Sequence, residues 1–352
     1  MITTLSVAIP CRADEPGLET TLESLSIACQ DFRLPPSLLP DLVICINSLQ
    51  PGDVCVPLTV ARDFCVRYGV PSEEIWLASS EQTTTDRGQS TYPSSFTEAS
   101  QERSNPQSSR TSQTLLSGPF SRCTVLLTAR RGKPPAWNIL WRWVRGETVL
   151  FSDADVRVDQ AAVFFLYHRL QQDAALRLVA AREVPVLQDG GTLWSRMGAI
   201  PYRFNFGNAG GRLLLIRKAA LPSGIPEDLL LEDAWLTVAV GRDHVAKESR
   251  AQVFFLPPAT GRDYFAERVR TEGGKLQIHR VHRELLATGP IARYQWSQFR
   301  QEIALKEYPL VMLALVLRVS ARLWAWFTLT RKDFYSLYRL FSSTKKWESR
   351  RG

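Results

Sequence analysis

Two carboxylates follow a short apolar segment in the middle of the chain and could bind a divalent cation. Residues 148–151 (TVLF) are typical of a buried strand, and Asp153 and Asp155 come directly after them. Side chains two positions apart in an extended segment point the same way, and carboxylate oxygens suit Mg²⁺ and Mn²⁺. Asp153 and Asp155 are therefore candidate ligands of a metal ion that bridges a diphosphate. The alternative is that these acidic residues simply begin a turn.

A second acidic pair could supply a general base. Glu232 and Asp233 precede the apolar run 234–238, which has a helical pattern, and a carboxylate at a helix start is stabilised by the helix dipole. Glu227 and Asp228 form a competing pair five residues upstream. We favour Asp233 as the base. The alternative is that either pair only caps a helix.

The elements around these residues alternate between strand and helix patterns. Short apolar runs typical of strands occur at 5–10, 41–46, 75–78, 124–128, 148–151 and 213–216, and helical spacing occurs at 18–28 and 55–68. This alternation predicts a mostly parallel sheet flanked by helices on both faces. Open α/β sheets bind ligands at the carboxyl ends of their strands, which is where the acidic residues are expected.

The segment between Ser79 and Thr114 has no Val, Ile, Leu, Met, Trp or Cys and is dominated by Ser, Thr, Gln and Pro. Such a composition buries too little apolar surface to offset the entropy lost on ordering. We predict a disordered insertion over 79–122 within a single catalytic domain that spans 1–300. A basic, amphipathic helical segment is expected over 301–352.

Four segments, in order along the chain, resemble the motifs of family 2 glycosyltransferases, whose catalytic domain has the GT-A fold. Residues 6–15 are similar to the first strand and nucleotide-binding turn, and 132–138 to the G-K-x-x-A-x-N segment. Residues 153–155 match the D-x-D motif, and 232–233 match the E-D pair. The likeness covers most of the chain outside the insertion and the C-terminal segment, and the shared order makes the combination more specific than any single motif.

The resemblance implies a nucleotide diphospho-sugar donor, with a UDP-sugar expected, and a Mg²⁺ or Mn²⁺ ion held chiefly by Asp155 with Asp153 beside it. Asp233 would take a proton from an acceptor hydroxyl during one inverting displacement. Residues expected to contact the donor are Pro10, Arg12, Glu15, Asn47, Lys133 and Asp153. Residues expected to contact the acceptor or the diphosphate are Gly207, Asn208, Glu232, Arg268 and Arg270.

Two positions depart from the family pattern. Asn47 stands where a base-binding Asp is usual, and residues 267–271 (ERVRT) stand where Q-x-x-R-W is common. Arg268 and Arg270 could equally lie on a solvated helix face. Two other functions therefore stay open: a nucleotidyltransferase, which would not require a base at Asp233, and a catalytically silent membrane scaffold of the same fold.

The net charge of +8 is concentrated near the C-terminus. From Arg318 onward nine basic residues face two acidic ones, and the rest of the chain is close to neutral, so no nucleic-acid partner is expected. Residues 309–340 show helical spacing rich in Leu, Val, Trp and Phe. This pattern favours an amphipathic helix on an anionic membrane, and the alternative is a helix packed on the catalytic domain.

The longest apolar run in this region, 310–317, is shorter than the roughly 20 residues of a spanning helix, although a re-entrant segment stays an alternative. The N-terminus lacks the pattern of a secretory signal, and the six cysteines include no C-x-x-C pair. We expect free, buried thiols and a cytoplasmic protein on the inner face of a membrane. A lipid or lipid-linked acceptor would suit that location.

Overall fold

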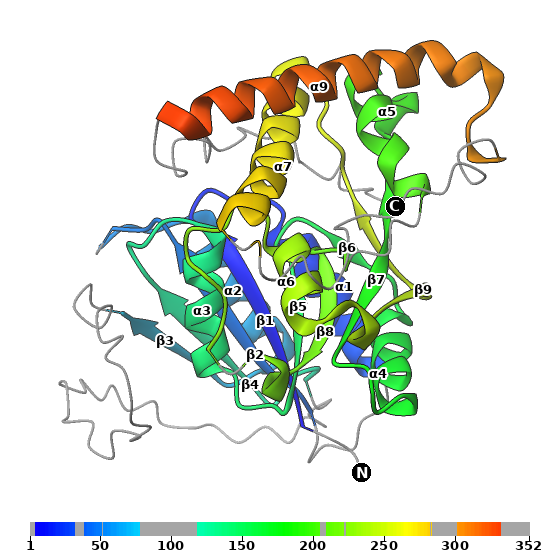
Figure 1. The fold of residues 1–352 in the computed structure, drawn as a ribbon. Helices are drawn as coiled ribbons and strands as arrows, with labels where there is room; N and C mark the ends of the chain where they lie inside the picture. The colour runs from blue at the N-terminus through cyan, green and yellow to red at the C-terminus, as the bar shows by residue number, and fades with distance from the viewer. Residues whose placement is uncertain are drawn as a thin grey trace, which may run out of the picture.

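The computed structural model describes residues 4–31, 39–50, 52–77, 118–204, 209–221, 223–281, 283 and 301–331. Within these ranges nine strands form one sheet, in the order β3-β4-β2-β1-β5-β8-β7-β9-β6 (Figure 1). Helices cover both faces of the sheet. The predicted fold class, an α/β fold with a mostly parallel sheet flanked by helices and a helical C-terminal segment, is confirmed.

The first half of the sheet is parallel. Its strands are β1 (Leu5–Arg12), β2 (Asp41–Asn47), β3 (Ser72–Trp76), β4 (Arg122–Leu127) and β5 (Thr148–Ser152). Parallel strands run the same way, so their carboxyl ends meet at one edge of the sheet.

The second half contains β6 (Arg157–Val158), β7 (Leu178–Pro185), β8 (Leu213–Arg217) and β9 (Val245–Phe255). β8 runs antiparallel to β5 and β7, and β7 and β9 are parallel to each other. The start of β8 therefore lies at the same edge as the ends of β5, β7 and β9. Segments far apart in the sequence are brought together there.

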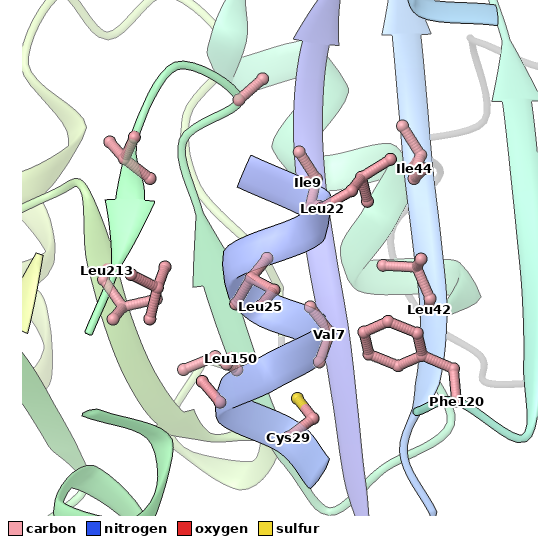
Figure 2. Close-up of a cluster of buried hydrophobic side chains, with 14 of the residues drawn as sticks. Val7, Ile9, Leu22, Leu25, Cys29, Leu42, Ile44, Phe120, Leu150 and Leu213 are labelled. Atoms are coloured by element: carbon pink, nitrogen blue, oxygen red, sulfur yellow. The ribbon is translucent and has the colours of Figure 1, made fainter. Parts of the chain in front are cut away.

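The sheet is buried on both faces, as the continuous apolar runs predict. One face is covered by α1 (Leu18–Asp31), α2 (Val56–Tyr68) and α4 (Ala162–Gln172), and the other by α3 (Lys133–Trp143) and α6 (Glu232–Val240). Figure 2 shows Leu22 and Leu25 of α1 beside Val7 and Ile9 of β1. These four side chains are completely buried, which fixes α1 and the loop before it against the strand edge.

The predicted insertion over 79–122 lies outside the described residues as far as position 117. Residues 118–122 are described, and they belong to the folded domain. Phe120 is buried, with its ring centroid 6.1 Å from that of Phe64 in α2, and β4 begins at Arg122.

The remaining helices gather above the carboxyl edge of the sheet. They are α5 (Leu193–Ala199), α7 (Gly261–Val281) and α9 (Tyr308–Arg331), and α9 crosses over the other two (Figure 1). Short 3₁₀ turns complete the described elements: η3 (Gln188–Gly190), η4 (Ile200–Arg203), η5 (Lys218–Ala220), η6 (Arg242–His244) and η8 (Leu305–Glu307).

One face of α9 is packed on α7. Ala321 and Ala325 of α9 are completely buried, and the buried Glu272 of α7 receives two arginines of α9: Nε of Arg318 at 2.8 Å and Nη1 of Arg322 at 3.6 Å. Both arginines belong to the basic residues that the sequence predicted to attract an anionic membrane. Their pairing with Glu272 shows that they also bind this helix to the domain.

The opposite face of α9 is apolar and exposed. Met312, Val316, Val319, Leu323 and Phe327 are each more than half exposed, and their spacing of three or four residues places them on one stripe. By length and composition, residues 305–328 could cross a membrane, with a mean hydropathy of 1.7 and 17% of the segment buried. The sequence alone had suggested a shorter apolar segment.

Candidate active site

Lys133 forms the centre of an ion-pair cluster at the carboxyl edge of the sheet. Its Nζ lies 2.6 Å from Oδ1 of Asp153, which follows β5, and 2.5 Å from Oε1 of Glu232, which begins α6. A small hollow at this point is lined by these three residues together with Pro10 and Gly211, among others. Four segments identified in the sequence thus meet in space.

The charges in this cluster support one another. Burial alone would raise the pKa of Glu232, but the nearby cations Lys133 and Arg270 lower it below its usual value. Burial would lower the pKa of Lys133, but Asp153 and Glu232 raise it. Glu232 is therefore ionised and paired at neutral pH, which makes it a poor proton acceptor and a good anchor for Lys133.

Asp233 has the opposite character. Burial, together with the negative charges of Glu232 and Glu183, raises its pKa to about 6. Its Oδ1 accepts a hydrogen bond from the N–H of Ala234 at 2.7 Å. A carboxyl group with a pKa near neutrality is suited to accept a proton during a reaction and to release it afterwards.

A glycine-rich segment passes close to Asp233. A Cβ atom added at Gly211 would lie 3.0 Å from the Cβ of Asp233, a tight contact that glycine avoids. The hydroxyl of Thr237 in α6 holds the segment by accepting the N–H of Ala209 at 3.0 Å. The predicted contact residues Gly207 and Asn208, in the same segment, lie outside the described residues.

Asp155 lies in the turn that follows β5, beside the loop between β1 and α1. A Cβ added at Gly17 would lie 2.8 Å from its Cα. The turn is held by Thr21 of α1, whose Oγ1 donates to the carbonyl of Val156 at 2.8 Å and accepts its N–H at 3.0 Å. The extended geometry expected for 153–155 is not found, because the chain turns at Ala154 and Asp155. Each carboxylate therefore has different neighbours.

The donor groups at the carboxyl edge bear on the predicted metal site. Within the described part of the chain, no three His, Cys, Asp or Glu side chains are grouped to hold a metal ion. Mg²⁺ in nucleotide sites commonly takes one or two carboxylates and fills its other positions with phosphate oxygens and water. A metal ion at Asp153 and Asp155 would therefore need substrate oxygens and water to complete its coordination.

Other predicted donor residues lie at the ends of β1 and β2. Arg12 pairs with Asp14 at 2.7 Å, and Oε1 of Glu15 accepts the N–H of Gly17 at 3.1 Å, which shapes the loop beside Asp155. Asn47 is buried, and its Nδ2 donates to the carbonyl of Gly132 at 3.0 Å. This bond fixes the start of α3, so Asn47 positions the turn that presents Lys133.

The competing acidic pair is engaged elsewhere. Glu227 forms an ion pair with Arg130, and Gln277 of α7 donates to the backbone carbonyl of Asp228 at 2.7 Å, with the Asp228 carboxylate 3.5 Å away. These contacts tie the segment before α6 to the loop before α3 and to α7. Asp228 therefore lies in a different network of contacts from that of Asp233.

The two arginines of α7 have different surroundings. Arg268 is mostly buried, 2.5 Å from Glu267 and over the ring of Tyr264 at 5.5 Å, so it does not lie on a solvated helix face. Arg270 is close enough to Glu232 to lower the pKa of that carboxyl group. α7 therefore brings positive charge to the cluster around Lys133.

Glu183 and Arg212 were not anticipated from the sequence as site residues. Nη1 of Arg212 lies 3.7 Å from Oε1 of Glu183, and the backbone carbonyl of Arg212 accepts the N–H of Asp153 at 2.9 Å. The Arg212 guanidinium also lies 3.8 Å from the centroid of the Phe255 ring. The strand 178–185 contains two charged residues, Arg182 and Glu183, after four apolar ones, and this interruption was the signal that could have identified Glu183.

No protein-family model matches this sequence, and no curated protein sequence matches it. Among solved structures, the chain aligns with the mannosyltransferase PcManGT from Pyrobaculum calidifontis in complex with GDP-Man and Mn²⁺. The identity is 15% over 92% of this chain and 72% of that chain, with a TM-score of 0.49. It also aligns with residues 1–349 of S. aureus TarS in complex with UDP-GlcNAc, at 13% identity over 90% of this chain and 81% of that chain, with a TM-score of 0.44.

The first of these proteins is a mannosyltransferase, and the second is in complex with a nucleotide-sugar. At these identities and scores the likeness carries no weight for the chemistry of this chain. The function proposed below therefore depends on the residues at the carboxyl edge of its own sheet.

Proposed function

We propose that the protein is a glycosyltransferase that moves a sugar from a nucleotide diphospho-sugar to an acceptor hydroxyl. One arrangement carries the proposal: the partly buried Asp233, with its pKa raised to about 6, lies directly beside the paired cluster of Lys133, Asp153 and Glu232. A proton acceptor next to fixed charges is what a displacement with an anionic leaving group requires.

In the proposed reaction, the acceptor oxygen attacks the anomeric carbon as the bond from that carbon to the diphosphate oxygen breaks. Asp233 accepts the proton of the acceptor hydroxyl, and the configuration at the carbon is inverted. Lys133 and Arg270 provide positive charge near the departing diphosphate. A Mg²⁺ or Mn²⁺ ion bound by Asp155 and Asp153 would stabilise the same negative charge.

The sequence left two other functions open. A nucleotidyltransferase would also use a nucleotide at a parallel sheet, but it gives no role to a carboxyl group with a raised pKa at Asp233. A silent scaffold would not need a carboxyl group with a raised pKa, because burying an ionisable group without a function only destabilises the fold. The environment of Asp233 favours the transferase over both.

A screen of nucleotide-sugars by thermal unfolding tests the proposal. The full chain is expected to be stabilised by at least one UDP-sugar or GDP-sugar with Mn²⁺, and less so with EDTA. A ligand at 100 times its dissociation constant adds about 2.7 kcal/mol to the free energy of unfolding, which is easily measured. No stabilisation by any nucleotide-sugar, with or without metal, would contradict the proposal.

We further propose that the enzyme is cytoplasmic and that α9 lies flat on the inner surface of a membrane. The exposed apolar stripe of α9 faces away from α7, and the middle of the helix is tied to the domain by the Arg318–Glu272 pair. If α9 crossed a membrane, the buried charge of Glu272 and the adjoining part of α7 would have to enter the hydrocarbon, which is unfavourable.

The positive charge of the C-terminal segment supports binding to an anionic membrane surface. Six basic residues and two acidic ones follow Arg331 in the sequence. Each basic residue near an anionic surface contributes about 1 kcal/mol of attraction, and the apolar stripe adds a part that salt does not weaken. Placement beside a membrane suits a lipid or lipid-linked acceptor.

Charges introduced into the stripe are expected to prevent membrane binding. The double variant Val319→Glu/Leu323→Glu should lose flotation with anionic vesicles, because both positions face away from α7 and two carboxylates oppose apolar burial. The unmodified full chain should float with anionic vesicles and be partly released by salt.

The matched control is Val56→Glu/Val66→Glu, which makes the same charge change at two exposed positions of α2. This control should float normally. Equal flotation of all three proteins, or an unmodified chain that never floats, would show that α9 does not bind membranes.

A further inference from the structure

A second cavity lies on the same edge of the sheet, beyond the ends of β7 and β9. Its volume is about 300 Å³, which is in the range of small-molecule sites. Three segments line it: the end of β7 with η3, the start of α5, and the chain after β9. The cavity is separate from the hollow around Lys133.

The polar groups of this cavity suit hydroxyl groups better than phosphate. Asp189, Gln188, Thr192 and Ser195 line it, and no Lys or Arg is among the lining residues. Ser195 is almost completely buried, its Oγ donates to the carbonyl of Thr192 at 3.0 Å, and the Thr192 hydroxyl lies 3.3 Å from the same Oγ, so a second lone pair of this oxygen can accept from a ligand. A ligand with several O–H donors and no charge matches this set.

The rest of the lining is apolar and continues onto the surface. Leu256, Pro257 and Ala259 form one wall. Leu187 and Leu193 flank the lining residues in sequence, and they are 38% and 48% exposed. α5 also contacts α9, and both helices lie above the carboxyl edge of the sheet (Figure 1). A ligand with an apolar tail could therefore extend along Leu187 and Leu193.

A series of contacts links the cavity to the reaction site. The N–H of Val186, which lines the cavity, donates to the carbonyl of Phe255 at 2.8 Å. The Phe255 ring packs on Arg212, whose carbonyl accepts the N–H of Asp153. Glu183 comes three residues before Val186 in the chain, and it lies close enough to Asp233 for its charge to raise the pKa of that carboxyl group. Extended chain rises about 3.3 Å per residue. A ligand of one or two sugar rings is therefore long enough to span the three residues from Val186 to Glu183.

We propose that the cavity binds the acceptor, and that the acceptor is a lipid with an uncharged sugar or polyol head. The head occupies the space between Ser195 and Ala259, with a hydroxyl directed past Phe255 to Asp233, and the tail follows Leu187 and Leu193 toward the membrane face. This inference rests on the proposed transferase function, and it specifies the acceptor for the same site.

Direct binding to the full chain tests the inference without requiring turnover. The probes are hexyl β-D-glucoside, glucose and hexyl phosphate, measured by calorimetry in the absence of nucleotide. Hexyl glucoside is expected to bind at least about 10-fold more tightly than either other probe, since burying two or more CH₂ groups is worth about 1.5 kcal/mol. Tighter binding of hexyl phosphate would overturn the uncharged-head assignment, and equal binding of glucose would overturn the lipid tail.

Substitutions that fill the cavity test whether hexyl glucoside binds there. Ala259→Phe should weaken hexyl glucoside binding at least about 10-fold, whereas Ala259→Ser, which keeps the volume, should bind like the unmodified chain. The Ala259 carbonyl that accepts from Thr192 is retained in both. Val186→Phe fills the cavity from the opposite wall and replaces Ala259→Phe if that variant unfolds.

Stabilisation by the best nucleotide-sugar should be the same in the unmodified chain and in all variants. Undiminished glucoside binding in both filling variants would overturn the cavity assignment and leave the transferase proposal intact. Absence of nucleotide-sugar binding with normal glucoside binding would instead contradict the transferase proposal.

Discussion

Replacement of Asp233 with Asn is expected to lower turnover by about 100-fold or more while leaving donor affinity nearly unchanged. An amide keeps the size of the carboxyl group, and its oxygen can still accept the N–H of Ala234, but it cannot accept a proton from the acceptor hydroxyl. Initial rates at saturating donor, with donor affinity measured by calorimetry, separate the two quantities.

Asp228→Asn is the matched control, because it makes the same chemical change in the competing acidic pair. Its backbone carbonyl keeps the hydrogen bond from Gln277, so turnover should stay close to that of the unmodified enzyme. If the two variants exchanged phenotypes, Asp228 would be the base and the assignment of Asp233 would be wrong.

The pH dependence of turnover should report the same group. Asp233 must be ionised to accept a proton, and its pKa is raised to about 6, so turnover should fall about tenfold per pH unit below that value. The raised pKa also means that the folded state binds this proton more tightly than the unfolded state, so ionisation of Asp233 lowers stability as pH rises toward and through 6. Asp233→Asn should therefore unfold at a higher temperature than the unmodified chain at pH 8, which excludes loss of structure as the cause of its low turnover.

The sheet could be predicted from the sequence because its strands are buried on both faces. Val7 and Ile9 face α1, and Ala8 faces the opposite layer, so the run that contains them has no polar interruption. The acidic motifs were identifiable for a related reason. Asp153 and Glu232 each adjoin an apolar element, and parallel strands bring such positions to a common edge.

The site residues that the sequence did not predict are positioned by contacts between segments far apart in the chain. Glu183 and Arg212 meet because β8 runs antiparallel between β5 and β7, and no local pattern specifies that order. The orientation of α9 is a similar case. From the sequence, Arg318 and Arg322 were expected to face a membrane. In the structure, their ion-pair partner Glu272 lies on another helix and directs them toward the domain.

The effect of Asp155 on donor binding is the second large change that we expect. Asp155→Ala removes one of the two carboxylates proposed to hold Mg²⁺ or Mn²⁺, and Asp153 already forms an ion pair with Lys133. A hard cation bound through few protein ligands depends strongly on each of them. The variant should bind the best nucleotide-sugar about 100-fold more weakly in Mn²⁺, with the same residual affinity that the unmodified chain shows in EDTA.

Calorimetry with and without Mn²⁺ measures this loss, and the control must separate metal binding from a change in net charge. Asp243→Ala removes an exposed carboxylate just before β9, at the opposite edge of the sheet, and should leave donor affinity unchanged. The turn around Asp155 is held by Thr21 through the backbone of Val156, so the alanine variant should keep its fold. Donor affinity that stays the same in Asp155→Ala, or falls equally in both variants, would mean that Asp155 does not bind the metal and that the donor is held by the cations alone.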